Sequence, residues 1–429
     1  MQLQSNIKEN NNFYLLSKVI IIILIIFINK NFDIGKNVII IEWRSEDINK
    51  KILRLIKKLN RFEFKRKPKY ILFFDFITSP ICSDKNSYLL FQEYKTNNDT
   101  NAYYVINEKT ELYKSLLQKN QTQNLIPFTN FSNIEELFPY LLNSKIIVQS
   151  YALYEFQIII NKVKYLKLLY ICHAVNYFKI NQIKDELLKL DKDKQHIVLT
   201  SPYEYNLYNK MNLYNKKSMH FAGLPRYEQL SKNKKESNNE PCILTTFTYR
   251  SYNHSIYVNS LFRRNLVSLL KDETLLSFLK KKSINLIYIP HHFDEIRHRT
   301  LKKNEFPKII IEKQESLSYY IEKCSLLITD FSSISFDFMF QKKPVLFYFI
   351  DVNEKFDFKE KSYMKIDENN SIYFENVFYE KIPLVNKVKY YINRKFNLDV
   401  GLSKKYKSLF YYKKGIINKV IKIINELTE

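Results

Sequence analysis

The chain has 429 residues, which is enough for two domains with separate hydrophobic cores. Its formal charge of +24 would by itself point to a nucleic acid, a membrane surface or an acidic substrate. Lys, Asn, Ile, Tyr and Phe are abundant beside only four glycines, which indicates a coding bias that raises Lys everywhere, so we expect no nucleic-acid partner.

The N-terminal part contains one strongly apolar segment. Residues 13–28 are mostly apolar, and 19–27 form an unbroken apolar run. These sixteen residues would rise about 24 Å as a helix, short of the roughly 30 Å hydrocarbon core, although Lys18 and Lys30 can snorkel. No small-residue cleavage site follows, which argues against a signal peptide.

Three interpretations of this segment remain open: a membrane anchor, a helix that dips into the membrane, or a buried element of the first domain. We assign residues 1–40 to a polar tail and a hydrophobic, membrane-associated segment. If the segment spans the bilayer, the Lys and Arg excess after it places the rest of the chain in the cytoplasm. We therefore expect the protein at the cytoplasmic face of the cell membrane, anchored or peripheral.

A basic amphipathic pattern follows at residues 48–62. Its apolar positions share one helical face, with basic residues elsewhere: Ile48, Ile52, Leu55, Ile56, Leu59 and Phe62 against Lys50, Lys51, Arg54, Lys57, Lys58 and Arg61. Such a helix suits an anionic membrane surface. An ordinary core-facing helix with solvated lysines explains the pattern equally well.

From residue 70 onward, short apolar runs alternate with helical patterns. Strand-like runs occur at 70–76, 102–106, 145–149, 166–172 and 196–199, and helical patterns occur at 88–94, 133–142 and 202–208. This alternation predicts parallel sheets covered by helices.

The polar, glycine-free stretch 231–240 is the best candidate for a linker between domains. After it the alternation restarts, with strand-like runs at 242–247, 285–289 and 308–312 and helical patterns at 258–281 and 317–323. We therefore predict two Rossmann-like domains, 41–235 and 236–429, whose parallel sheets face a shared cleft. Two further helices are expected at 384–394 and 415–427.

Residues 325–348 read as strand, tight loop, helix and second strand. Residues 326–329 are apolar, Asp330, Ser332 and Ser333 interrupt the run, and residues 345–348 resume it after Pro344. In open α/β folds ligands bind at the carboxyl ends of the strands, where this loop would lie. Ser332 or Ser333 can cap the helix, and the free N–H groups of its first turn suit an anion.

Two histidine positions lie at the carboxyl ends of strand-like runs. His173 comes after residues 168–172, and His291 comes after residues 285–289, so each predicted domain has a histidine at a strand end. Histidines facing one cleft suit the roles of general base and phosphate partner at neutral pH.

Several other kinds of chemistry lose their usual support. The sequence has no GxGxxG, Walker, HExxH or GxSxG motif. Its four cysteines are scattered without metal-ligand spacing, which predicts simple core packing in a reducing compartment. Asp330 and Asp337 have the chemistry to ligate a metal, but a loop carboxylate and a helix-surface carboxylate explain them better, so we assign no residue as a metal ligand.

The chain resembles a known family at this point. The segment Leu327-Ile-Thr-Asp-Phe-Ser-Ser-Ile-Ser-Phe-Asp-Phe, ending in Lys343-Pro-Val-Leu-Phe-Tyr348, is similar to the hallmark of the CDP-glycerol glycerophosphotransferases, the teichoic-acid primases and polymerases. Further landmarks come in the family's order: Ser83-Asp-Lys-Asn-Ser87, Cys172-His-Ala174, Ser201-Pro-Tyr, Gly223-Leu-Pro-Arg-Tyr-Glu-Gln-Leu230, Thr245-Thr-Phe-Thr-Tyr-Arg250 and Ile289-Pro-His291. The resemblance covers about residues 70–350.

The resemblance implies a GT-B-like fold whose C-terminal half holds CDP-glycerol and whose N-terminal half presents the acceptor. His173 would deprotonate an acceptor hydroxyl, which attacks the β-phosphorus and expels CMP. His291, Ser332, Ser333 and the loop amides would hold the diphosphate.

The remaining site residues have less defined roles in this scheme. Thr248 lies in one of the landmark segments, and Asp337 would orient the loop. Arg250 and Arg226 are phosphate partners or structural residues, and both alternatives stay open.

The partners implied are a CDP-alditol donor, a lipid-linked or polymeric glycan acceptor, and the membrane surface. No cofactor is implied, and the need for a divalent metal stays open. Departures from the family pattern, such as Ala174, Glu228 and His292, weaken the substrate assignment more than the fold. A glycosyltransferase of capsule or surface-polysaccharide synthesis that uses a nucleotide sugar is therefore an alternative. A basic, non-enzymatic membrane- or RNA-binding protein is a weaker one.

Overall fold

The computed structural model describes residues 68–75, 85–97, 101–128, 134–151, 163, 165–175, 191–232, 241–250, 254–296, 301–313, 316–351 and 376–429. Every element named below belongs to one compact unit, Phe64–Glu429. The apolar segment 13–28 and the amphipathic pattern 48–62 lie outside the described residues. Within those residues, the structure has no helix that combines the length and apolar character needed to cross a membrane.

The first sheet has seven parallel strands in the order β3-β2-β1-β4-β5-β6-β7. The strands are β1 (Tyr70–Phe74), β2 (Ala102–Asn107), β3 (Leu125–Phe128), β4 (Ser144–Gln149), β5 (Lys167–Tyr170), β6 (Gln195–Leu199) and β7 (Met219–Phe221). Its helices are α4 (Asn86–Asn97), α5 (Glu111–Gln118), α6 (Ile134–Leu142), α9 (Pro202–Met211) and α10 (Pro225–Lys232), and a 3₁₀ turn spans Lys216–Ser218. The central strands read as continuous apolar runs because both of their faces are buried.

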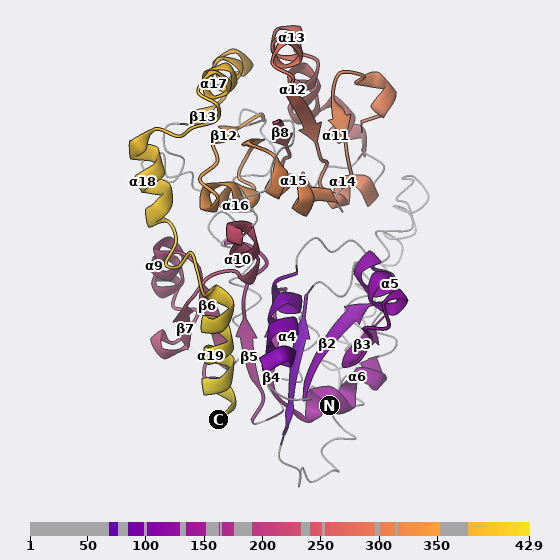
Figure 1. Ribbon diagram of the computed structural model, residues 1–429, viewed down its shortest axis with the longest axis vertical. Coiled ribbons are helices and arrows are strands. Elements are labelled where there is room, and N and C mark those ends of the chain that lie inside the picture. Colours follow the sequence, from indigo (N-terminus) through magenta and orange to yellow (C-terminus); the bar gives the residue numbers. More distant parts are fainter. Residues whose placement is uncertain are drawn as a thin grey trace, which may run out of the picture. The chain divides into compact units, whose positions relative to one another are not determined.

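The second sheet has six parallel strands in the order β10-β9-β8-β11-β12-β13. They are β8 (Cys242–Thr245), β9 (Asn285–Tyr288), β10 (Ile310–Ile311), β11 (Leu326–Thr329), β12 (Val345–Tyr348) and β13 (Val377–Phe378). The helices are α11 (His254–Asn259), α12 (Leu261–Leu270), α13 (Glu273–Lys281), α14 (His292–Ile296), α15 (Leu317–Lys323), α16 (Ile334–Phe340), α17 (Lys381–Asn393) and α18 (Val400–Ser408), with a 3₁₀ turn at Lys303–Glu305. Figure 1 shows both sheets with their helices.

The predicted α/β architecture with two parallel sheets is confirmed. Three strands were not predicted, β3, β7 and β13. β3 contains Pro127, which cannot donate a ladder hydrogen bond and is tolerated here because β3 is an edge strand. β7 has three residues and β13 has two, which is too few for a periodic signal.

The last helix, α19 (Ile416–Thr428), packs against the first sheet, although the sequence assigned it to the second domain. It contacts α4, α10 and β4 (Figure 1). The ammonium groups of Lys145 and Lys167 donate hydrogen bonds to the carbonyls of Thr428 (3.0 Å) and Leu427 (2.8 Å) at its C-terminal end, where cations are favoured by the helix dipole. By packing, residues 416–428 therefore belong with the first sheet. Most of the predicted linker, residues 233–240, lies outside the described residues.

Two cysteines that look unrelated in the sequence meet in the core. The Sγ atoms of Cys242, at the start of β8, and Cys324, just before β11, lie 2.7 Å apart, and both residues are buried. The prediction of simple core packing is confirmed for this pair, since both thiols are free and buried. Their contact was not predictable from their spacing, because the neighbouring strands β8 and β11 bring them together.

Candidate functional site

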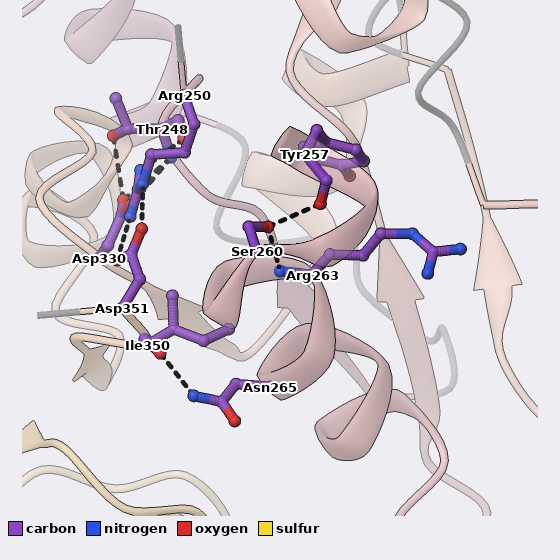
Figure 2. A network of polar contacts seen from close by, with 9 residues as sticks. All are labelled: Thr248, Arg250, Tyr257, Ser260, Arg263, Asn265, Asp330, Ile350 and Asp351. Carbon is purple, nitrogen blue, oxygen red and sulfur yellow. Dashed lines mark hydrogen bonds and ion pairs between the residues drawn. The ribbon is translucent and has the colours of Figure 1, made fainter. Parts of the chain in front are cut away.

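Asp330 directly follows β11 and anchors the loop that the sequence singled out. Its carboxylate is fully buried and accepts hydrogen bonds from the backbone N–H of Thr248 (3.0 Å) and from the Thr248 hydroxyl (2.9 Å). Thr248 follows β8, the strand next to β11, so the two loops are joined at the carboxyl edge of the sheet (Figure 2).

Arg250 joins a third strand end to this pair. Its Nη1 group donates to Asp330 (2.7 Å), while Nε and Nη2 donate to the two oxygens of Asp351 (2.6 and 2.8 Å), the residue that follows Ile350 after β12 (Figure 2). Burial disfavours the charged guanidinium, but Asp351 and Asp330 outweigh this effect and raise the pKa of Arg250 above its ordinary value. The geometry favours the structural alternative for Arg250, because each of its nitrogens already donates to a protein oxygen.

Ser332 and Ser333 are half-buried between Asp330 and α16. Ser333 occupies the N-cap position, but its side chain makes no capping hydrogen bond, so the predicted hydroxyl cap is wrong for Ser333. The reason is its backbone, which is helical (φ −62°, ψ −15°), whereas an N-cap side chain normally reaches back from an extended residue. The carbonyl of Ser332 instead accepts the N–H and the hydroxyl of Ser335.

His291 stands at the carboxyl end of β9, as predicted, on the neighbouring strand to β8. Its ring lies 5.7 Å from that of Tyr249, the residue between Thr248 and Arg250, and stacks on Phe293. The half-buried histidine is therefore adjacent to the loop that contacts Asp330.

His173 follows β5 and is held by an unusual backbone. Cys172, directly before it, has a positive φ of 54°, a left-handed conformation that is costly for a non-glycine residue. The side chain of Asn86, in the first turn of α4, donates to the Cys172 carbonyl (3.3 Å). The His173 ring stacks on Tyr151 at 4.3 Å between centroids, which restricts the plane of the imidazole.

Arg226, in the first turn of α10, links this histidine segment to the second sheet. Its Nη1 group donates to the His173 carbonyl, while Nε and Nη2 form a bidentate pair with the Asp337 carboxylate (2.7 and 3.0 Å) on α16. The side chains of Arg226 and Asp337 are 19% and 2% exposed. Burial raises the pKa of Asp337, and the adjacent guanidinium opposes that rise.

Asp75 is a site-supporting residue that the sequence did not single out. Its buried carboxylate accepts hydrogen bonds from the backbone N–H groups of Ser87 and Tyr88 (3.0 Å each), from the Ser150 hydroxyl (2.6 Å) and from the Tyr104 hydroxyl (2.9 Å). Burial raises the pKa of Asp75, and these donors oppose the rise. A carboxylate directly after an apolar strand run was the available signal.

The contacts thus fall into two groups. One group contains Thr248, Arg250 and Asp330. The other contains His173, Arg226 and Asp337. The segment 330–337 connects them, because Asp330 and Asp337 lie at its two ends with Ser332 and Ser333 between. Asp337 pairs with Arg226, and Asp330 pairs with Arg250 and Thr248. The described part of the chain contains no cluster of three metal-ligating side chains.

Comparison with known proteins gives matches to one family and to several solved structures. The family described as CDP-Glycerol:Poly(glycerophosphate) glycerophosphotransferase matches residues 55–424. The minor teichoic acid biosynthesis protein GgaB of Bacillus subtilis (strain 168) is 24% identical over 357 residues, which cover 78% of this chain and 37% of GgaB. The chain therefore spans well under half the length of this relative.

Among solved structures, the wall teichoic acid polymerase TagF has a TM-score of 0.60 at 14% identity and covers 90% of this chain and 97% of its own. UDP-N-acetylglucosamine 2-epimerase from Rickettsia bellii has a TM-score of 0.51 at 11% identity and covers 84% of this chain and 97% of its own. At these identities the two structures establish a shared fold.

Proposed function

The chain belongs to the CDP-glycerol:poly(glycerophosphate) glycerophosphotransferase family, and on this premise we propose that it transfers glycerol phosphate from CDP-glycerol to a teichoic-acid-like polymer and releases CMP. The observation that carries the proposal is the loop 330–333. It lies at the carboxyl edge of the second sheet, presents two half-buried hydroxyls, and is held in place by Thr248 and Arg250.

The donor site in this proposal is built around that loop. The hydroxyls of Ser332 and Ser333 and the loop amides bind the diphosphate, and His291 donates to it from the end of β9, two strands away from β11. The hydroxyls, the amides and the histidine stabilise the negative charge that develops on the diphosphate as CMP leaves. Arg250 acts indirectly, because its ion pairs with Asp330 and Asp351 determine where the loop stands.

His173 is the general base in the proposed reaction. Its imidazole takes the proton of an acceptor hydroxyl, and the resulting oxygen attacks the β-phosphorus of CDP-glycerol in line. One P–O bond forms to the acceptor and one breaks to CMP, which leaves with the bridging oxygen. Because the Tyr151 ring restricts the imidazole plane, the base is already oriented before the acceptor binds.

We further propose that the enzyme works at the cytoplasmic face of the cell membrane on a lipid-linked or polymeric acceptor. The support is in the sequence: the apolar segment 13–28 and the basic, amphipathic segment 48–62 both suit an anionic bilayer surface. Sedimentation of the full chain with vesicles containing anionic lipid tests this placement, and recovery of the protein only in the supernatant would contradict it.

The enzymatic proposal is tested by incubating the full chain with CDP-glycerol and lipid-linked acceptors. The expected products are CMP and an acceptor that is heavier by glycerol phosphate, both identified by mass spectrometry. Failure of a folded, lipid-supplied sample to consume any CDP-alditol would refute the proposal. Release of UDP from a UDP-sugar would instead identify a glycosyltransferase. A CMP-sugar donor also releases CMP, so in that case an acceptor that gains a sugar would identify a glycosyltransferase.

Two substitutions test the assigned roles. His173→Ala is expected to abolish turnover while CDP-glycerol still binds, because the donor contacts lie on the other sheet. Ser333→Ala is expected to weaken donor binding, and Ser408→Ala, which removes an exposed hydroxyl on α18, serves as the matched control. Equal and small effects of His173→Ala and Ser333→Ala would show that the site has been misassigned.

A further inference from the structure

We infer that Arg226 is a positioning residue which couples the base-bearing segment of the first sheet to helix α16 of the second, and that it is not a ligand for substrate phosphates. The inference rests on the proposed function, in which His173 is the base. In this inference, the side chain of Arg226 fixes the position of His173 relative to the donor loop 330–333.

On the first sheet, Arg226 contacts the segment before and at the base. Its backbone N–H donates to the side-chain oxygen of Asn86 (3.0 Å), and the same Asn86 amide donates to the Cys172 carbonyl. Its guanidinium donates to the carbonyl of His173. Two successive carbonyls of a strained turn are therefore held by one residue pair, which opposes relaxation of the positive φ at Cys172.

On the second sheet, Arg226 is joined to α16 by a contact that fixes direction as well as distance. The bidentate pair with Asp337 uses two parallel N–H···O bonds, a geometry specific to a guanidinium. The next residue, Tyr227, stacks on Phe340, one turn beyond Asp337, at 4.3 Å between ring centroids. These two neighbouring contacts determine the orientation of α16, whose N-terminal side carries Ser332 and Ser333.

This arrangement leaves little of Arg226 for a phosphate. Nε and Nη2 donate to Asp337 and Nη1 donates to His173, so each nitrogen already has a protein acceptor. A phosphate would also compete with a carboxylate whose side chain is 2% exposed. Because a misplacement of about 1 Å can cost roughly a hundredfold in rate, the coupling should appear in turnover.

The test separates stability from turnover with paired variants. Arg226→Met removes the guanidinium and leaves Asp337 buried without its cation, so a lower melting temperature is expected. Adding Asp337→Asn removes the buried charge and should restore most of the melting temperature. Turnover should stay at least roughly tenfold below wild type in the double variant, with the KM for CDP-glycerol changed less than about threefold, because the His173 contact is still absent.

A second variant covers the outcome in which the double variant does not fold. Arg226→Lys keeps a cation beside Asp337, but one ammonium cannot make the bidentate pair with Asp337 and also donate to the His173 carbonyl. It should fold and lose turnover to a similar degree. The matched control is Lys381→Met with Asp272→Asn. This pair of changes removes an ion pair (2.9 Å) between the starts of α17 and α13 and should leave kcat unchanged.

A readout that needs no activity distinguishes this inference from the proposed function. Hydrogen exchange of a peptide covering 167–175 should be faster in Arg226→Met/Asp337→Asn and unchanged in the control. If wild type does not consume CDP-glycerol, the proposed function fails while this measurement still decides the coupling. Recovery of turnover together with stability would reduce Arg226 to a structural role, and a raised KM with unchanged kcat would make it a phosphate ligand.

Discussion

Replacing Arg250 by Met should destabilise the protein strongly. The Met side chain keeps the apolar stem but removes a guanidinium that is 2% exposed and lies between two carboxylates. Asp351 then loses two hydrogen bonds, while Asp330 loses one and keeps those from Thr248. Two buried negative charges are left close together without the cation that joined them.

The expected cost follows from the burial of all three groups. Removing one partner of a buried ion pair costs about 3–5 kcal/mol, because the remaining charge stays desolvated. At about 2–4 °C for each kcal/mol in a domain of this size, the melting temperature should fall by roughly 6–20 °C. The buried aromatics Phe262 and Phe331, whose ring centroids lie 4.7 and 4.9 Å from the guanidinium carbon, lose a cation contact as well.

Thermal unfolding followed by circular dichroism measures this effect. Lys308→Met is the control, since it removes an exposed ion pair with Glu273 (side chains 56% and 70% exposed) and should cost about 0–1 kcal/mol. Adding Asp351→Asn to Arg250→Met should recover part of the loss, because a neutral amide replaces a buried charge. A melting temperature for Arg250→Met equal to that of the Lys308 control would refute the reasoning.

Two further predictions concern pairs of side chains away from the site. Nδ1 of His196 lies 3.1 Å from Nε2 of His220; burial and the neighbouring ring lower the pKa of His196 to about 4, and burial lowers that of His220. Below about pH 6.5 the unfolded chain protonates these two histidines, whereas the folded chain keeps them neutral. The free energy of unfolding should therefore be constant above about pH 6.5 and fall by up to about 3 kcal/mol toward pH 4. Denaturant midpoints measured across this range should show the slope, and His196→Asn should flatten it; an unchanged slope would contradict the assignment. Diamide, which accepts two hydrogens, should oxidise Cys242 and Cys324 to a disulfide because their Sγ atoms already touch. Mass spectrometry should find the crosslinked peptide, with Cys242→Ser as the control, and two thiols that stay free in the folded, treated protein would exclude it.

Most of the secondary structure was predictable because parallel strands are buried on both faces. Runs such as 145–149 and 285–289 therefore appear in the sequence as unbroken apolar stretches, and they form β4 and β9. The pattern failed where that cause was absent, in the edge strand β3 with Pro127 and in the short edge strands β7 and β13. Residue 415 marked the start of the last helix correctly, but periodicity carries no information about which sheet that helix covers.

The candidate site was predictable in its positions and less so in its contacts. His173 and Asp330 were identified because each directly follows an apolar run, and His291 because it follows one after Pro290. The partners of the two arginines were not predictable, because Asp351 is 101 residues from Arg250 and Asp337 is 111 residues from Arg226. Ion pairs over such separations have no periodic signature.

The sequence by itself determined the α/β class, the order of most strands and helices along the chain, and the family, because these depend on local apolar patterns and on short motifs. Only the tertiary structure decided which residues hold the site in place. Arg250 and Arg226 have the same chemistry in the sequence, but one joins three strand ends within a sheet and the other joins two sheets. That difference arises from which carboxylates the packed elements bring within hydrogen-bond distance.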